Sequence, residues 1–425
     1  MSCVAVMEHV EILFVLACVF GFLMAWGVGA NDVANAMGTS VGSRAITIKQ
    51  AIWIAAIFEF MGALLAGGSV TKTIRGDIIN PHYIDIAPYL LVDGMLASLL
   101  AAAVWLFIAT RQGWPVSTTH SIVGAIIGFG VISFGFEAIY WQKVVNIVFS
   151  WLITPFIAGI IAFGFFRSVQ YFVLSRDDPI HQARTVIPIY IFLVATIICL
   201  VTLTKGLKHL GLHLSFLQSA GITLGLATAF SLLGLFLIRR QRPVEDPDSH
   251  DRLQRVEQMF GILMIFTACS MAFAHGSNDV ANAIGPLAAA IQILKSNAHI
   301  STHAPIPFWI LMLGAVGIVF GLATYGYRVI ATIGERITEL KPSRGFAAEL
   351  ATASTVVIAS GVGLPISTTQ TLVGAVLGVG LARGISALNM RVIGHIFTSW
   401  LITLPAGAIL SVLFFYTLRW IFGHG

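Results

Sequence analysis

Residues 31–38 read NDVANAMG, and the same stretch returns at residues 278–285 as NDVANAIG, with seven of eight positions identical. Residues 117–128 (STTHSIVGAIIG) return in the same way at residues 367–378 (STTQTLVGAVLG), and both copies follow a Pro-x pair. A third echo, SWLIT, stands at residues 150–154 and 399–403. Three matches in one order at nearly one offset show that the chain is written twice, and this decides its architecture.

The composition makes lipid the solvent of most of the chain. Of 425 residues, 57% are hydrophobic and 10% charged, and the mean hydropathy is +0.90, whereas soluble domains carry about 25% charged residues. Several long stretches are nearly free of charge, and about 20 such residues cross a bilayer as a helix. The sequence therefore predicts an all-α, multi-pass membrane protein with about twelve membrane segments.

The two copies divide the chain into a first repeat (1–166), a connector (167–255) and a second repeat (256–425). The connector holds two apolar spans flanked by two arginine-bearing loops, 167–184 and 239–255. Two crossings separate these loops, so both face one side, which the positive-inside rule assigns to the cytoplasm. The N-terminal tail lacks basic residues up to its apolar run, which favours termini outside and an odd number of crossings per copy. Such copies are inverted repeats, with broken helices and re-entrant half-helices expected near the midplane.

The Asn-Asp motifs place carboxylates inside apolar sequence, where a charge costs at least about 2.5–3.5 kcal/mol and so indicates function. We expect each motif to interrupt its helix. Carboxylate and amide oxygens suit a hard cation such as Na⁺, although Asp and Asn also cap helix starts. Cation or substrate binding is the favoured interpretation, and the predicted ligands are Asn31, Asp32, Asn35, Asn278, Asp279 and Asn282.

The Ser-Thr-Thr motifs have the composition of an anion site. A proline precedes each motif, as it does at many helix starts, where free backbone N–H groups and the helix dipole attract phosphate-like groups. Ordinary capping and hydroxyl bonding within the helix are the alternative. The predicted anion ligands are Ser117, Thr118, Thr119, Ser367, Thr368 and Thr369, with Asp32 and Asp279 beside them. The Gly-xxx-Gly pairs that follow in each copy are expected to serve close helix packing.

Four further polar residues are candidates for the same machinery. Glu59 and Glu349 lie in or at the start of apolar helices, where each could join a cation site or pair with a basic neighbour. His120 occupies the position that Gln370 holds in the second copy, and could contact substrate or carry a proton. A hydrogen-bonded structural histidine is the alternative, and the same applies to His275, which precedes the second Asn-Asp motif.

These paired motifs closely resemble those of the inorganic phosphate transporter (PiT) family, over nearly the whole chain. The resemblance implies Na⁺- or H⁺-coupled uptake of inorganic phosphate, inverted repeats, outside termini and a homodimer. It also places Asp32, Asp279, Glu59, Glu349, Ser117 and Ser367 at positions important for transport. Two features depart from the pattern: Gln370 stands where members often have His, and the 239–255 loop is short.

Other function classes fit the sequence less well. A pump would need a P-loop and a metalloprotease His-Glu-x-x-His, and neither pattern is present. The basic residues are scattered and predict no nucleic-acid partner. A passive ion channel, a sulfate or other oxyanion carrier, and an H⁺-coupled or metal–phosphate symporter remain alternatives. We expect no enzyme activity, no cofactor beyond the coupling ion, and a multi-pass protein of the bacterial inner (plasma) membrane, surrounded by lipid.

Overall fold

The computed structural model describes residues 10–76, 78–80, 83, 87–212, 214–241, 249–295, 306–327, 329–330, 340–384 and 390–422. Over these residues the fold is helical, apart from one isolated bridge between Ile79 and Ile139. The helices are α2 (Val10–Gly42), α3 (Ile48–Ala66), α4 (Gly68–Gly76), α6 (Pro88–Arg111), α7 (Thr118–Phe134), α8 (Trp141–Val169), α9 (Pro179–Thr204), α10 (Phe216–Arg239), α11 (Ser249–Lys295), α12 (Phe308–Tyr325), α14 (Pro342–Gly361), α15 (Thr368–Arg383) and α16 (Met390–Ile421).

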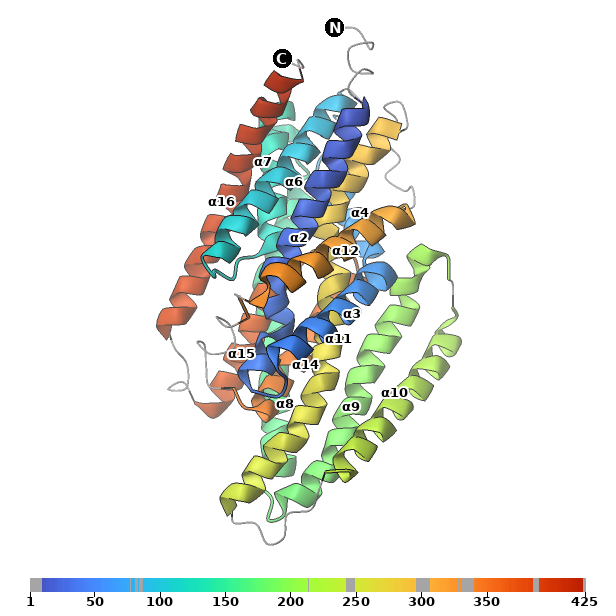
Figure 1. Ribbon diagram of the computed structural model, residues 1–425, viewed down its shortest axis with the longest axis vertical. Helices are drawn as coiled ribbons and strands as arrows, with labels where there is room; N and C mark the ends of the chain where they lie inside the picture. Colours follow the sequence, from blue (N-terminus) through green and yellow to red (C-terminus); the bar gives the residue numbers. More distant parts are fainter. Residues whose placement is uncertain are drawn as a thin grey trace.

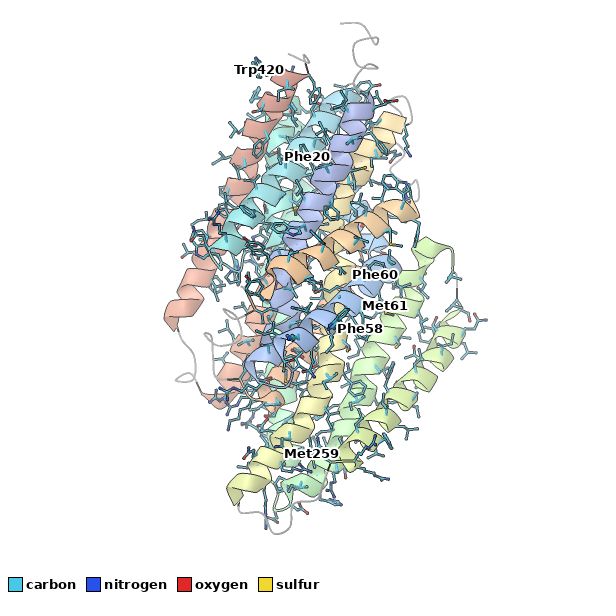
Figure 2. All side chains as sticks on the ribbon, viewed as in Figure 1. Phe20, Phe58, Phe60, Met61, Met259 and Trp420 are labelled. Atoms are coloured by element: carbon cyan, nitrogen blue, oxygen red, sulfur yellow. The ribbon has the colours of Figure 1, made fainter. Side chains whose placement is uncertain are left out.

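Nine of the described helices are long and apolar enough to cross a membrane: α2, α3, α6, α8, α9, α10, α11, α12 and α16. The remaining helices, α4, α7, α14 and α15, are shorter or more polar. The outer surface carries large apolar side chains, such as Leu217, which is 82% exposed, and Trp420, which Figure 2 shows at the end of α16. These features confirm the prediction of an all-α, multi-pass membrane protein.

Helices α2 and α11, which carry the two Asn-Asp motifs, run in opposite directions. In Figure 1, α2 begins at the end of the molecule where α16 finishes, whereas α11 begins at the other end. The end of α8, the start of α9 and the end of α10 lie at that same second end. The described parts of the two arginine-bearing segments therefore lie at one end of the molecule, and the start of α2 and the end of α16 lie at the other. Residues 242–248 of the second segment lie outside the described residues.

The expected helix breaks at the Asn-Asp motifs do not occur. Helix α2 runs unbroken for 33 residues through Asn31 and Asp32, and α11 runs unbroken for 47 residues through Asn278 and Asp279. The amide N–H groups of the motif asparagines donate to side chains and carbonyls outside their own helix turn, and the helix backbone stays closed. The interruptions lie elsewhere, at Gly67 between α3 and α4, and where α7 and α15 begin inside the protein.

Glycines let helices of one copy pack closely on helices of the other. A Cβ at Gly374 or Gly378 of α15 would overlap the backbone of α8, and one at Gly124 of α7 would overlap the Leu404 carbonyl of α16. The expected packing role of the Gly-xxx-Gly pairs is therefore confirmed. Similarly, a Cβ at Gly29 of α2 would overlap the backbone of α12.

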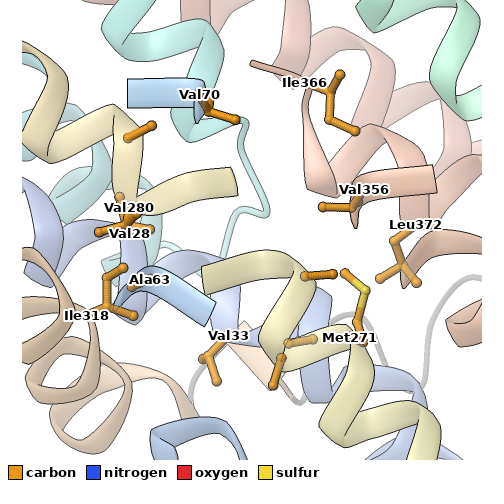
Figure 3. Close-up of a cluster of buried hydrophobic side chains, with 14 of the residues drawn as sticks. Val28, Val33, Ala63, Val70, Met271, Val280, Ile318, Val356, Ile366 and Leu372 are labelled. Carbon is orange, nitrogen blue, oxygen red and sulfur yellow. The ribbon is translucent and has the colours of Figure 1, made fainter. Parts of the chain in front are cut away.

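The interior is one core shared by both copies. Figure 3 shows Val28 and Val33 of α2 near Val280 and Met271 of α11, with Ile318 of α12 beside them. All five side chains are fully buried. Because helices of the two copies alternate in this core, the polar motifs of both copies are brought to one place.

Candidate functional site

Two helices of the site begin deep inside the protein, at the Ser-Thr-Thr motifs. Ser117 and Ser367 are the N-caps of α7 and α15, and the Oγ of each accepts a hydrogen bond of 3.3 Å from the backbone N–H three residues on. Both serines thus cap their helices, which was the alternative to anion binding for these motifs. Capping uses a lone pair of each serine and leaves the hydroxyl proton and first-turn N–H groups for a ligand.

The two helix starts meet each other. Thr119 Oγ1 donates a 3.0 Å hydrogen bond to the Ile366 carbonyl, and Thr369 Oγ1 donates one of 3.1 Å to the Val116 carbonyl. Each helix start is therefore tied to the segment that precedes the other. This reciprocal pair brings the positive ends of two helix dipoles together, which is a favourable environment for an anion.

A carboxylate lies against each helix start. Thr118 Oγ1 donates to Asp32 Oδ2 at 2.7 Å, and Thr368 Oγ1 donates to Asp279 Oδ2 at 2.8 Å. Both aspartates are completely buried. The predicted carboxylates and hydroxyls of the two copies thus form one continuous polar cluster inside the apolar core.

Asn35 and Asn282 bridge the copies and keep a free oxygen each. Asn35 Nδ2 donates to Asp32 Oδ1 at 3.1 Å and to Thr369 Oγ1 at 2.7 Å, whereas Asn282 Nδ2 donates to Asp279 Oδ1 and Thr119 Oγ1. The Oδ1 atoms of both asparagines are buried without a hydrogen-bond partner among the described residues. Buried acceptors of this kind call for a missing donor or a cation.

Asn31 and Asn278 have a different role from their neighbours. Asn31 Nδ2 donates to Thr110 Oγ1 and to the Trp114 carbonyl, both at 3.0 Å, and its Oδ1 accepts from the Val116 N–H. Asn31 thus fixes the turn that leads into α7. Its Oδ1 accepts one hydrogen bond, whereas the Oδ1 atoms of Asn35 and Asn282 accept none.

Asn278 repeats this arrangement in the second copy. Its Nδ2 donates to Ser360 Oγ at 3.0 Å and to the Leu364 carbonyl at 3.2 Å, which fixes the turn before α15. Its Oδ1 has no hydrogen-bond partner among the described residues.

His275 joins Glu59 to the aspartate cluster. Its Nδ1 lies 3.0 Å from Glu59 Oε1, while its Nε2 lies 3.0 Å from Asp279 Oδ2 and 4.0 Å from Asp32 Oδ2. Asp32, His275 and Asp279 could together offer three ligand atoms to a metal ion, all within 4.8 Å of one another. The histidine's importance could have been read from the sequence, because it stands four residues before Asp279 and so shares its helix face.

Glu349 lies in a separate polar cluster. It accepts hydrogen bonds from Thr39 Oγ1 and Ser40 Oγ of α2, both at 2.5 Å, and from Thr267 Oγ1 of α11 at 2.6 Å. The side chain is completely buried. Sequence reasoning missed the three hydroxyls, although Thr39 and Ser40 follow the first Asn-Asp motif by about two helical turns.

His120 of α7 and Gln370 of α15 are also buried, but on a different face of their helices from the threonine hydroxyls. The His120 ring packs on Trp151 with 3.9 Å between centroids, and both His120 and Gln370 line a cavity between α8, α15 and α16. The two side chains therefore lie at the cavity wall, where His120 contacts Trp151 and Gln370.

The central cluster is closed to solvent. Asp32, Asp279, Glu59 and His275 have no exposed surface, and none of the serines and threonines of the two Ser-Thr-Thr motifs exceeds 2% exposure. Such an enclosed set of oxygen atoms and helix N-termini can bind small ions in the absence of water. Ions could enter and leave only after the surrounding helices move.

Comparison with known proteins assigns this chain to one family. Residues 28–411 match the phosphate transporter family. The chain is 52% identical over 410 residues to a Haemophilus influenzae protein named as a phosphate permease, covering 96% of this chain and 97% of that one. It is 42% identical to the chloroplastic inorganic phosphate transporter 2-1 of Arabidopsis thaliana, covering 97% and 72% of the two chains.

A solved structure agrees with these sequence matches. The structure of a protein described as the sodium-dependent phosphate transporter superimposes with a TM-score of 0.89 at 39% identity, covering 96% of this chain and 99% of that one. These relatives are transporters and permeases, so the expectation of a protein without enzyme activity is confirmed. The resemblance seen in the paired motifs is confirmed as well: the chain belongs to the phosphate transporter family.

Proposed function

We propose that this protein imports inorganic phosphate together with Na⁺ by alternating access. The observation that carries the proposal is the meeting of two capped helix starts, α7 and α15, with Asp32 and Asp279 hydrogen-bonded to their first turns. The helix starts supply donors for an oxyanion, and the carboxylates supply charge for cations.

The anion is proposed to bind between the helix starts, to their N–H groups and to the Ser117 and Ser367 hydroxyls. A phosphate there would lie close to two carboxylates, and like charges repel strongly where water is excluded. The anion therefore binds well only when cations occupy the carboxylates. This dependence is the physical basis of coupling, because neither ion binds well without the other.

Two cation positions are proposed, one at Asp32 with Asn35 and one at Asp279 with Asn282. Both asparagines have an unpartnered oxygen, and oxygen-rich sets of this kind suit Na⁺ better than a proton alone. Moving one charge against about 100 mV costs about 2.3 kcal/mol, so a phosphate dianion needs at least two cations to enter against the potential. The relative described as sodium-dependent supports the same choice of ion.

The architecture suits alternating access. We propose that residues 1–166 and 256–425 are inverted repeats joined by a connector at 167–255, and that rearrangement of the helices around the closed site exposes it to each side in turn. The opposite directions of α2 and α11 support this division. We also propose that the protein resides in a bacterial inner membrane as a homodimer, with both termini outside.

The orientation can be tested by cysteine labelling. A cysteine placed at Asp178, in the turn before α9, should be protected from an impermeant thiol reagent added outside, whereas one at Glu11 should react. The arginines near position 178 favour a cytoplasmic location for that loop. Reaction of the Asp178 site from outside would contradict the proposed orientation, and permeabilised cells provide the control for reactivity.

Loss of a hydroxyl at the anion site should weaken phosphate binding. Ser117→Ala and Ser367→Ala should each raise the phosphate concentration at half-maximal uptake about tenfold, because a hydrogen bond to a charged group contributes about 1.5–3 kcal/mol. Thr403→Ala in α16 is a matched control, since this buried threonine bonds only within its own helix. Unchanged half-saturation in both site variants would leave the motifs with a capping role alone.

The coupling ion is tested by reconstitution. Purified protein in vesicles should accumulate labelled phosphate when an inward Na⁺ gradient is imposed at equal pH, and not when a pH gradient is imposed without Na⁺. Accumulation driven by the pH gradient alone would show that the coupling ion is H⁺ and not Na⁺. Competition with sulfate, and uptake with and without divalent cations, identify the anion.

A further inference from the structure

A cavity of about 810 Å³ lies between α8, α15 and α16, next to the first turns of α7 and α15. It follows α8 from Val148 to Phe163, which is about 22 Å of helix. Its volume falls within the range of small-molecule sites, about 300–1,000 Å³. The lining is dominated by aromatic and aliphatic side chains, with Trp151 and Phe156 on one wall and Trp400 and Leu404 on another.

The cavity opens toward the membrane. The lining residues Phe156 and Ile160 of α8 are 71% and 58% exposed, and Leu401 of α16 is 78% exposed. Both helices are long and apolar enough to cross the bilayer, so these exposed side chains face lipid chains. A ligand that reaches the cavity therefore comes from the membrane and needs an apolar body.

The cavity also has buried polar groups in its wall. His120 Nε2, Gln370 Oε1 and Trp400 Nε1 belong to lining residues and make no hydrogen bond that meets the usual distance and angle limits among the described residues, although the His120 and Gln370 side chains lie next to each other. All three side chains are more than nine-tenths buried. A buried polar group without a partner requires an explanation, and one molecule with a hydroxyl group could satisfy a donor and an acceptor at once.

We propose that this cavity binds a neutral amphiphile from the bilayer, with one alkyl chain and a hydroxyl-bearing head. Apart from the His120 imidazole, the described residues that line the cavity carry no ionisable side chain, which disfavours a charged head group. The Trp400 indole N–H would donate to the head, and the Gln370 side-chain oxygen would accept from it. The alkyl chain would lie along α8 toward Phe163.

Occupancy of the cavity bears on the anion site, and this part rests on the proposed function. His120 and Gln370 belong to the first turns of α7 and α15, and their backbone N–H groups bond to Ser117 and Ser367. Trp151 donates from Nε1 to the Pro365 carbonyl, just before α15. A molecule seated here presses on both helix starts from the back and so modulates phosphate affinity.

Binding is tested with full-length protein in phosphatidylcholine nanodiscs and a photoactivatable monooleoylglycerol, in the absence of phosphate. Labelling should saturate, map to peptides covering residues 148–163 and 397–405, and be displaced by monooleoylglycerol but not by oleate anion. Ile160→Trp should fill the groove and abolish this labelling, whereas Leu232→Trp on the lipid face of α10 should not. Labelling that never saturates, or that is equal in both variants, would show bulk lipid contact only and overturn the proposal.

A second variant tests the polar wall. Trp400→Phe keeps an aromatic ring and removes the N–H, so the affinity for monooleoylglycerol should fall about tenfold. Unchanged affinity would overturn the assigned head group. Cross-linking of two chains through a cysteine at position 156, with no lipid labelling, would show that a second copy covers the cavity and would also overturn the proposal.

The consequence for transport is measured separately. Added monooleoylglycerol should shift the half-saturation for phosphate in the native protein and in Leu232→Trp, but not in Ile160→Trp. The same half-saturation with and without monooleoylglycerol in the native protein would refute the modulation, even where labelling succeeds. Absence of phosphate uptake in every variant would count against the proposed function and leave the labelling result to decide the cavity.

Discussion

Replacing either buried aspartate by asparagine should abolish gradient-driven phosphate accumulation while the protein still folds. Asp32→Asn and Asp279→Asn keep the side-chain volume and remove a charge that is costly in the membrane interior. The threonine hydroxyls of α7 and α15 can still donate to the amide oxygen. Apparent Na⁺ affinity should fall more steeply than phosphate affinity, because the carboxylate contacts the cation directly.

The measurement is uptake against Na⁺ concentration in reconstituted vesicles, normalised to folded protein. Glu137→Gln, at an exposed carboxylate, should behave as the native protein. Linkage supplies an additional check, since a cation that no longer binds cannot raise phosphate affinity. Native Na⁺ dependence in both aspartate variants would remove these residues from the coupling mechanism.

A single methyl group at Gly378 should destabilise the fold severely. The Cβ of Gly378→Ala would overlap the carbonyl of Gly159 in α8, and helix backbones cannot yield as side chains do. Overpacking of this kind costs about 1–3 kcal/mol or more. The expected result is a marked drop in the yield of folded protein and in its melting temperature.

Gly164→Ala is the matched control, because the same change in α8 meets open space. Alanine favours a helix over glycine by roughly 0.5–1 kcal/mol, so this variant should be slightly more stable in detergent. Equal melting temperatures for both variants would mean that α8 and α15 are not packed backbone to backbone.

Hydropathy predicts the helical membrane fold, and the repeated motifs predict the polar residues at its centre. Hydropathy fixes which segments enter the membrane, and intramembrane Asp and Asn stand out because burying them is costly. The predicted helix breaks are misplaced because the sequence does not show that Thr110 and Ser360 accept hydrogen bonds from the Asn31 and Asn278 amide groups. Such partners lie about 80 residues away along the chain.

The sites of Glu349 and His275 show the same limit. Both residues were noticed as polar groups in apolar sequence, yet neither Glu349's contact with Thr39 nor His275's contact with Glu59 follows from any local spacing. The separation of His120 from the threonine hydroxyls likewise depends on which face of α7 turns toward α8. Local patterns identify costly residues, and only tertiary packing determines their partners.

The alternation of helices from the two copies also constrains how the chain is made. The hydrogen bond from Asn35 to Thr369 spans 334 residues, so its second partner leaves the ribosome on the order of tens of seconds after the first. Until then Asn35 of α2 and Thr119 of α7 lack their second-half partners, and the glycines of these helices lack the backbones that pack on them. The polar centre is therefore complete only after the second half has been inserted.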